Sequence, residues 1–213
     1  TMLHRLEQEP HASAANPFLD AQYGYYANAV RWAQQEGIVT GTSDTRFSPN
    51  APMTREQLAV VLYRYAQYLG RDTDRAASLN SYADGSTVSV YAREAMRWAV
   101  AEGLLSGVGN DLFDPDGMTT RAMLVSILYR MAGEPDVSEL PETPFEDVGP
   151  DAWYADAVRW AYANEVAAGI DDTHFTPDDR LTRAQLVTML YRAYGPEKGV
   201  RPRPIGGYTD WNT

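Results

Sequence analysis

The chain has 213 residues, of which 44% are hydrophobic, and its 18 basic and 29 acidic residues give a formal net charge of −11. The hydrophobic content excludes a wholly disordered chain, and the acidic balance argues against partners such as nucleic acid or an anionic membrane surface, which require a positive field. Cysteine is absent, which excludes disulfides, thiolate metal ligands and a cysteine nucleophile.

The N-terminal segment 1–15 resembles the end of a helix that recurs later in the chain. Its sequence TMLHRLEQEP is similar to SILYRMAGEP at 126–135 and to TMLYRAYGP at 188–196. We therefore expect residues 1–15 to be the tail of a truncated preceding unit.

A single ungapped pattern then occurs three times. It reads WAQQEGIVTGTSDTRFSPNAPMTREQLAVVL from Trp32, WAVAEGLLSGVGNDLFDPDGMTTRAMLVSIL from Trp98 and WAYANEVAAGIDDTHFTPDDRLTRAQLVTML from Trp160. A fixed internal period indicates a repeat architecture. We predict three tandem helix–loop–helix units at 16–70, 80–133 and 144–195, followed by an extended tail at 196–213.

The first helix of each unit is predicted from apolar residues at spacings of three and four, over about residues 25–36 in unit one. Gly37 and Gly103 end this helix in units one and two, as the left-handed position after a helix prefers. Unit three has Glu165 there, which we expect to cost up to about 1 kcal/mol. The following loop has one large apolar residue common to all units, and we expect it to pin the loop to the core: Phe47, Phe113 and Phe175.

The second helix begins at a threonine N-cap in each unit. Thr54 and Gln57 form a predicted capping box, which Thr182 and Gln185 repeat in unit three. In unit two Met123 replaces the glutamine, so only the threonine cap is expected. The broad apolar stripe of these helices is typical of a central position in a bundle. The predicted fold class is therefore all-α.

An arginine follows each N-cap, at Arg55, Arg121 and Arg183. A cation at the first helical position opposes the helix dipole by about 0.3–1 kcal/mol, so its recurrence needs a reason. One hypothesis is an ion pair with a carboxylate of the same unit, for which the candidates are Asp20, Asp84 and Asp147. The other is an anion site, in which the guanidinium and free helix amides hold a carboxylate or phosphate.

Trp32, Trp98 and Trp160 lie at the flank of the buried face of the first helices. One interpretation is packing in the core or between repeats. The other is an exposed aromatic platform on which sugar rings stack. The sequence leaves both open, because helical spacing does not give exposure.

Catalytic and metal-binding patterns are weak. Paired carboxylates such as Asp171-Asp172 have no equivalents in the other units, which argues against a glycosidase acid and nucleophile. His4, His11 and His174 are isolated and lack metal-ligand spacing. We predict no catalytic residue, no metal and no cofactor. The apolar runs are much shorter than the ~20 residues that span a bilayer, so no membrane insertion is expected.

The order of motifs resembles a known family. In unit three, FEDV at 145–148, WYADAVRWA at 153–161 and FTPDDRLTRAQLVTMLYR at 175–192 follow one another, and the other units carry related sequences. This order is similar to the S-layer homology domain, whose pattern runs from F-x-D through W-A, G-I-x-x-G and F-x-P to T-R-A-E. The resemblance implies a pseudo-threefold spindle of helices with ligand grooves between neighbouring units. It also implies an extracellular location at the bacterial cell wall, where such modules hold secondary cell-wall polysaccharide, commonly pyruvylated.

Carried onto this sequence, the resemblance assigns glycan binding to the three arginines, with the aspartates and tryptophans as further candidates: Arg55, Arg121, Arg183, Asp20, Asp84, Asp147, Trp32, Trp98 and Trp160. The chain departs from the T-R-A-E pattern, because Gln57, Met123 and Gln185 replace its glutamate and Glu56 replaces its alanine in unit one. We therefore expect unequal grooves.

The predicted function is a non-catalytic module that anchors a surface protein to an acidic cell-wall polysaccharide. The main alternative is a structural module that binds itself or other surface-layer proteins, through exposed aromatics such as the tyrosine-rich stretch 63–68. A glycan-degrading enzyme is the second alternative. The sequence does not identify the polymer or the parent protein.

Overall fold

The computed structural model describes residues 16–197, and within this range it contains helices and irregular loops but no strand. The first helices of the units are α1 (Ala27–Gln35), α3 (Arg93–Ala101) and α5 (Ala155–Ala163), and the second helices are α2 (Arg55–Tyr68), α4 (Arg121–Met131) and α6 (Arg183–Glu197). Short 3₁₀ helices η2 (Leu19–Ala21), η3 (Gly85–Thr87) and η4 (Val90–Ala92) lie in the segments that open units one and two. The all-α prediction is confirmed.

The helix ends follow the local signals of the sequence. Thr54 accepts a hydrogen bond from the amide of Gln57 and donates its own amide to the Gln57 side chain, which completes the predicted capping box. Thr182 and Gln185 make the same pair, whereas Thr120 only accepts from the amide of residue 123. Helix α1 begins two residues later than predicted, at Ala27, with Tyr26 as its N-cap.

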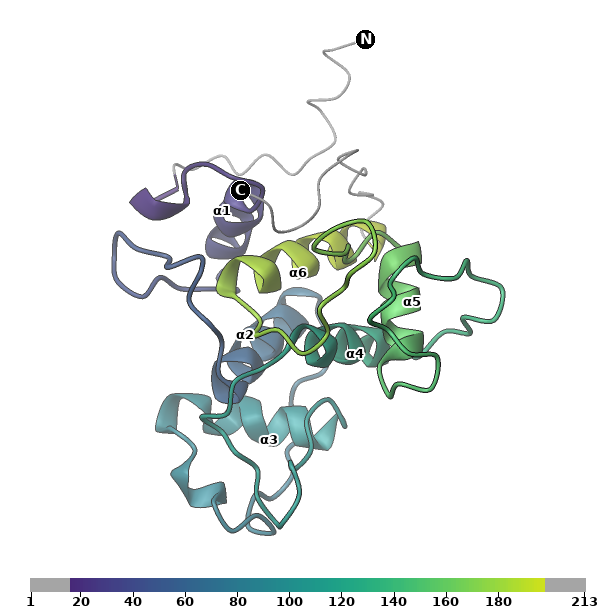
Figure 1. The fold of residues 1–213 in the computed structure, drawn as a ribbon. Helices are drawn as coiled ribbons and strands as arrows, with labels where there is room; N and C mark the ends of the chain where they lie inside the picture. The colour runs from purple at the N-terminus through teal and green to yellow at the C-terminus, as the bar shows by residue number, and fades with distance from the viewer. Residues whose placement is uncertain (1–15, 198–213) are drawn as a thin grey trace.

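Each second helix packs on the first helix of the following unit. Helix α2 lies against α3, α4 against α5, and α6 returns to α1 (Figure 1). A lone helix–loop–helix unit cannot bury its apolar faces, so every unit completes its core with its neighbour. The three units therefore close into a ring, and this arrangement supports the predicted threefold organisation.

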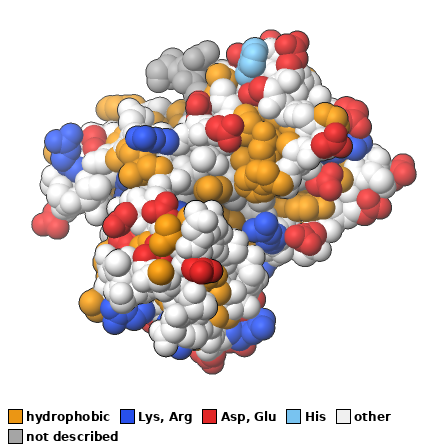
Figure 2. All heavy atoms as spheres, turned by 60° about the horizontal axis from the view of Figure 1, so that its bottom comes forward, with side chains coloured by type: hydrophobic (Ala, Val, Ile, Leu, Met, Phe, Trp, Pro, Cys, Tyr) orange, Lys and Arg blue, Asp and Glu red, His pale blue; other side chains and the backbone are white. Residues whose placement is uncertain are grey.

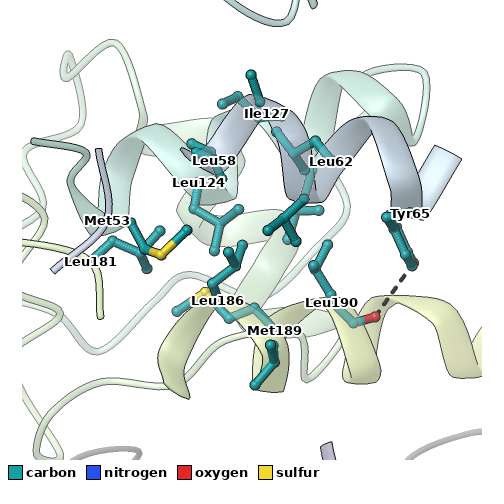
Figure 3. Close-up of a cluster of buried hydrophobic side chains, with 14 of the residues drawn as sticks. Met53, Leu58, Leu62, Tyr65, Leu124, Ile127, Leu181, Leu186, Met189 and Leu190 are labelled. Atoms are coloured by element: carbon teal, nitrogen blue, oxygen red, sulfur yellow. Dashed lines mark hydrogen bonds between the residues drawn. The ribbon is translucent and has the colours of Figure 1, made fainter. Parts of the chain in front are cut away.

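A cycle of backbone hydrogen bonds joins the three units at the centre. The amide of Met53 donates to the carbonyl of Leu181, Leu181 to Thr119, and Thr119 back to Met53, at 3.0, 2.9 and 2.9 Å. Leucine, isoleucine and methionine side chains of α2, α4 and α6 converge beside this cycle (Figure 3). The second helices thus form the core of the molecule, as the width of their apolar stripes predicted.

The phenylalanine in the loop of each unit packs into the core. Phe47, Phe113 and Phe175 are fully buried, which confirms their predicted role. The predicted tail at 1–15 lies outside the described residues. The predicted extended tail at 196–213 begins too early, because α6 continues through residue 197, and the rest of it lies outside the described residues. No helix of residues 16–197 is both long and apolar enough to cross a membrane. On the face that Figure 2 presents, acidic and basic side chains are dispersed and hydrophobic ones gather near the centre.

Candidate functional site

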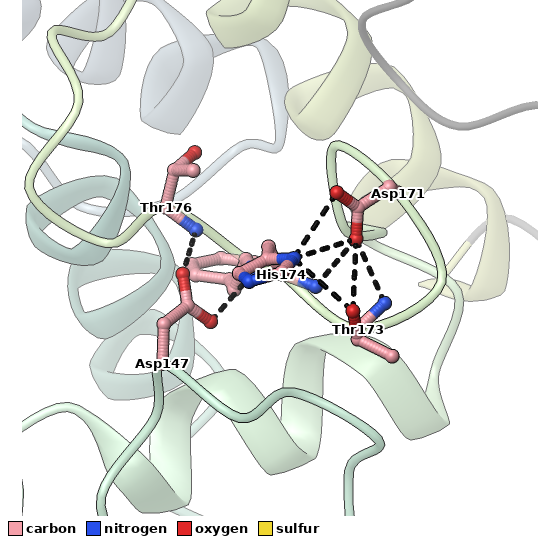
Figure 4. A network of polar contacts seen from close by, with 6 residues as sticks. Asp147, Asp171, Thr173, His174 and Thr176 are labelled. Carbon is pink, nitrogen blue, oxygen red and sulfur yellow. Dashed lines mark hydrogen bonds and ion pairs between the residues drawn. The ribbon is translucent and has the colours of Figure 1, made fainter.

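The aspartate that opens each unit holds the loop of its own unit. Asp147 accepts hydrogen bonds from the amides of Phe175 and Thr176, at 2.8 and 2.6 Å (Figure 4). Asp20 and Asp84 make the equivalent pairs of bonds in units one and two. The amide of Phe113 holds the pKa of Asp84 below its ordinary value against the opposing effect of desolvation, and the amide of residue 114 lowers it further.

These bonds stabilise a strained turn. The residue after each phenylalanine has a left-handed backbone, with φ of 59° at Ser48, 54° at Asp114 and 54° at Thr176. None of the three is glycine, so each conformation is unfavourable by itself. Because one carboxylate oxygen bonds the amide of that residue, the aspartate offsets the strain and fixes the loop.

The arginine of each unit crosses to the loop of the following unit. Arg55 donates from Nε to the carbonyl of Phe113 at 3.0 Å and from Nη2 to the carbonyl of Ser106. Its guanidinium also lies 5.4 Å from the centre of the Phe113 ring. Arg121 makes the same three contacts with the loop of unit three, and Arg183 makes them with the loop of unit one.

The hypothesis of a same-unit ion pair between these arginines and the aspartates is therefore wrong. The guanidiniums bond main-chain carbonyls of the next unit, and the carboxylates bond main-chain amides of their own. Both groups hold the same loop, since Arg55 bonds the carbonyl of Phe113 and Asp84 bonds its amide. Repeat spacing predicted the positions of these residues but not their partners.

The arginines differ in their access to solvent. Arg121 is 0% exposed and Arg55 is 5% exposed, whereas Arg183 is partly exposed. Burial lowers the pKa values of Arg55 and Arg183 from their ordinary value. Arginine titrates so far above neutrality that both remain cationic. Arg121 in this conformation contacts protein atoms alone.

The three repeat tryptophans lie in the core. Trp32, Trp98 and Trp160 are 2%, 3% and 9% exposed. The Trp32 ring packs edge-on against Tyr65 and Tyr68, and the Trp98 ring against Tyr63. These side chains therefore act as packing residues in this conformation, and no open ring face is available for a sugar.

A groove of about 480 Å³ lies where all three units meet. Arg55 of unit one lies in it, and the loop 104–108 and helix α4 of unit two form its walls. Trp153 of unit three lines the same groove and is 64% exposed. Ser126 of α4 is buried in the wall, and its hydroxyl has no hydrogen-bond partner among residues 16–197. Arg130, further along α4, adds a second guanidinium.

This groove brings together one predicted site residue, Arg55, with residues that sequence reasoning did not select. Trp153 lies seven residues before Trp160 in the sequence, and it precedes α5 rather than packing beneath it. The sequence feature that could have identified Trp153 is the aromatic residue at the equivalent position of the other units, Tyr25 and Tyr91. The groove contains two guanidiniums, of which Arg130 also pairs with Glu134 at 3.9 Å. It also contains an exposed aromatic face and a hydroxyl without a partner among residues 16–197.

Tyr91 occupies in unit two the position of Trp153, here called the wall position, and its surroundings differ from those of Trp153. Tyr91 donates its hydroxyl to Glu56 at 2.7 Å, and Glu56 also accepts two bonds from Ser89. Burial and this carboxylate raise the pKa of Tyr91 to about 12. Ala122 and Ala184 occupy the position of Glu56 in the other units, so this position is chemically different in unit one. No group of three potential metal-ligating side chains occurs in the described part of the chain.

Comparisons with known proteins agree with the repeat pattern. The sequence model of the S-layer homology domain matches residues 17–59, 81–122 and 144–187, which together make up more than half of the chain. The chain is 36% identical over 103 residues to a surface layer protein of Brevibacillus choshinensis and 33% identical over 122 residues to the surface-layer 125 kDa protein of Lysinibacillus sphaericus. It is also 30% identical over 112 residues to an endoglucanase of Bacillus sp. (strain KSM-635).

These alignments cover 47%, 56% and 53% of the chain but only 9%, 10% and 12% of the respective relatives. The chain thus spans about a tenth of the length of the proteins that it matches. Their names range from surface-layer proteins to a glycan-degrading enzyme. The similarity therefore concerns one module that occurs in proteins with different names.

Proposed function

Because the chain belongs to the S-layer homology family, whose members are modules of bacterial cell-surface proteins, we propose that it anchors its parent protein by binding an acidic cell-wall polysaccharide. The proposed binding site is the groove that contains Arg55, Ser126, Arg130 and Trp153. The observation that carries this proposal is the joint presence of two guanidiniums and an exposed indole in one inter-unit groove.

The chemistry of the groove suits an acidic sugar. Guanidinium groups bind carboxylates through charge-assisted hydrogen bonds, and Arg130 is the more exposed of the two. The hydroxyl of Ser126 can donate to a ring or hydroxyl oxygen, which would satisfy a buried polar atom. Trp153 offers an apolar face of the size of a sugar ring. The chain as a whole carries a net negative charge, so binding of an acidic sugar depends on the cations within the groove.

Among the residues predicted from the sequence, Arg55 lines the groove directly, and Arg183 is a proposed ligand contact in the equivalent groove of unit one. Arg121 and the three aspartates contribute by holding the groove loops. Binding of two or three grooves to one polymer chain would raise the avidity well above the affinity of a single groove. Because the grooves are unequal, we expect them to differ in affinity.

Self-assembly through the tyrosine-rich stretch 63–68 has less support. Tyr65 is 3% exposed, and Tyr63 and Tyr68 pack against tryptophan rings. Tyr63 and Tyr68 are half-buried, so these residues offer a partner little open aromatic surface in this conformation.

Co-sedimentation with purified cell-wall sacculi tests the proposal. The wild-type module should sediment with intact sacculi and lose binding after acid removal of the secondary polymer. Trp153→Ala should weaken binding by up to about tenfold, since stacking on an aromatic ring contributes roughly 0.5–1.5 kcal/mol. Tyr23→Ala is the matched control, because Tyr23 is 87% exposed and lies outside the groove.

The other outcomes are informative. Binding that survives acid stripping would identify peptidoglycan as the partner and contradict the polysaccharide proposal. The absence of binding to either preparation would contradict anchoring by this module and favour self-assembly. Equal loss of binding in both variants would show that Trp153 has no specific role.

A further inference from the structure

The segment that opens unit two is longer than its counterparts. The aromatic residue at the wall position follows the opening aromatic residue by nine positions in unit two (Tyr82 to Tyr91), but by eight in unit three and seven in unit one. This longer segment contains the two 3₁₀ helices η3 and η4. Helix η3, the linker before unit two and helix α3 line a second hollow of about 410 Å³.

This hollow has a basic and polar lining. Its residues are Ser78, Asn80, Gly85, Ser86, Arg93 and Arg97, with Leu79 beneath them, and none of these is acidic. It shares no residue with the groove at Arg55. The chain has a formal net charge of −11, whereas the lining of this hollow contains two arginines and no carboxylate.

The two arginines lie four residues apart on α3, and side chains at this spacing project from the same face of a helix. Arg97 donates from Nε to the carbonyl of Ala77 at 3.0 Å, and its carbonyl accepts from the Ala77 amide at 3.0 Å. These two bonds hold the linker and leave both terminal nitrogens of Arg97 for a ligand. Arg93 makes one long contact, from Nη2 to the carbonyl of Val88 at 3.5 Å. Neither arginine has an ion-pair partner within the described range 16–197.

The frame of the hollow is fixed by the backbone. A Cβ atom on Gly85 would lie 2.2 Å from the carbonyl oxygen of Leu79, so only glycine permits this close approach of η3 to the linker. The amide of Tyr82 bonds the same carbonyl, and the amide of Asn80 bonds the Ser78 hydroxyl oxygen. The Ser78 hydroxyl thus accepts one bond and keeps its own proton for another.

Arg93 belongs to unit two alone. The equivalent positions are Ala27 in unit one and Ala155 in unit three. As the first residue of α3, Arg93 also opposes the helix dipole, so it weakens rather than strengthens its own helix. The longer segment and the added cation therefore occur together in the same unit and line the same hollow.

We propose that this hollow binds a phosphate group, through the guanidiniums of Arg93 and Arg97 with the hydroxyls of Ser78 and Ser86. A phosphate presents several acceptor oxygens to donors that approach from different sides, and arginine matches its geometry with paired N–H groups. The site is separate from the glycan groove and extends the function of the module to a second ligand. A free phosphate monoester and the phosphodiester of a polymer both carry such acceptor oxygens. The experiment below distinguishes these two sources.

The test follows the backbone amides in two-dimensional ¹⁵N–¹H NMR spectra of the whole chain. Sodium phosphate and poly(glycerol phosphate) are titrated separately at constant ionic strength, with sodium chloride as the blank. We expect saturable shifts at Ser78, Asn80 and Ser86. Stronger binding of the polymer would identify the diester as the source, and stronger binding of inorganic phosphate would identify the monoester.

Arg93→Ala should weaken phosphate binding about tenfold or more, as expected for the loss of a charge-assisted contact. The variant should stay folded, because alanine occupies this position in both other units and Arg93 is exposed. Arg75→Ala is the matched control, since Arg75 is exposed and pairs with Glu102 outside the hollow. No saturable shift in the wild type, or equal binding by both variants, would overturn the proposal. Binding to sacculi through Trp153 is read separately, so either proposal can fail without the other.

Discussion

Arg183 donates from Nε to the carbonyl oxygen of Phe47 at 2.8 Å, although 136 residues separate the two in sequence. This bond joins the last unit to the first. The amides of Arg183 and Ala184 also donate to carbonyls of the unit-one loop, so the start of α6 is bonded to that loop through both main chain and side chain. The same set of contacts joins units one and two, and units two and three. Stability and the shape of each groove therefore depend on contacts between units.

The contacts that the repeat arginines make with the next unit, here called the arginine clasp, should not tolerate a lysine. Arg121 is fully buried and donates to the carbonyls of Phe175 and Ala168, each at 2.8 Å. Lysine cannot form this forked pair and leaves a buried carbonyl unsatisfied. Arg121→Lys should lower the free energy of unfolding by about 3 kcal/mol, measured by urea denaturation. Arg180→Lys, at an exposed position of the same region, should change it by less than about 0.5 kcal/mol. Equal effects of both substitutions would contradict the structural role of the clasp.

Glu165 occupies a backbone position that suits glycine. Its φ is 59°, and the equivalent Gly37 and Gly103 have φ of 71° and 69°. Glu165 is exposed, and a glycine at this position removes the strain of a left-handed side-chain residue. Glu165→Gly should therefore raise the free energy of unfolding by about 0.5–1 kcal/mol, which thermal unfolding detects as a higher Tm. Gly103→Ala should shift the Tm in the opposite direction. A lower Tm for Glu165→Gly would show that this side chain makes a contact that outweighs the strain.

The local part of this architecture was predictable from the sequence. The helix starts at Thr54, Thr120 and Thr182 follow from capping, which depends on neighbouring residues alone. The left-handed backbone at Glu165 follows from its alignment with two glycines. Such features need no knowledge of the tertiary structure, because the interacting groups are a few residues apart.

The pairing between units was not predictable in the same way. Spacing places Arg55 at the first position of α2 but gives no reason to choose a carbonyl in another unit over a nearby carboxylate. Helical periodicity likewise placed Trp98 at the flank of α3, and only the packing of α2 on α3 determines that Tyr63 covers it. The groove residues Ser126 and Trp153 come from different units, so neither could be assigned to a common site from one repeat.

The lowered pKa values of Asp20 and Asp84 predict acid sensitivity. A carboxyl group whose pKa is lower in the folded state stabilises the fold above its unfolded pKa, and this contribution is lost as the pH falls through the folded pKa. The decline should therefore begin below about pH 4, near the ordinary value for aspartate. Asp84→Asn should destabilise the protein at neutral pH and flatten this part of the pH profile, because the amide of Phe113 loses a charged acceptor. Urea midpoints between about pH 2 and pH 6 test this. Exposed Asp74→Asn is the control, and an unchanged slope in Asp84→Asn would contradict the assignment.

His174 gives the opposite pH dependence. Its Nδ1 lies 3.0 Å from Asp171 Oδ1, in the loop that leads to Phe175 (Figure 4). The hydrogen bond to this carboxylate, aided by its charge, raises the pKa of His174 above its ordinary value. A raised folded-state pKa stabilises the fold below the unfolded value of about 6.5, and the contribution disappears as the pH rises through the folded pKa. Imidazole resonances of His174 followed by NMR should therefore titrate above this value, and Asp171→Asn should bring the midpoint down. Both groups are about half exposed, so the effect on stability should be small and should decrease with added salt. A His174 midpoint that does not respond to Asp171→Asn would show that the contact is absent in solution.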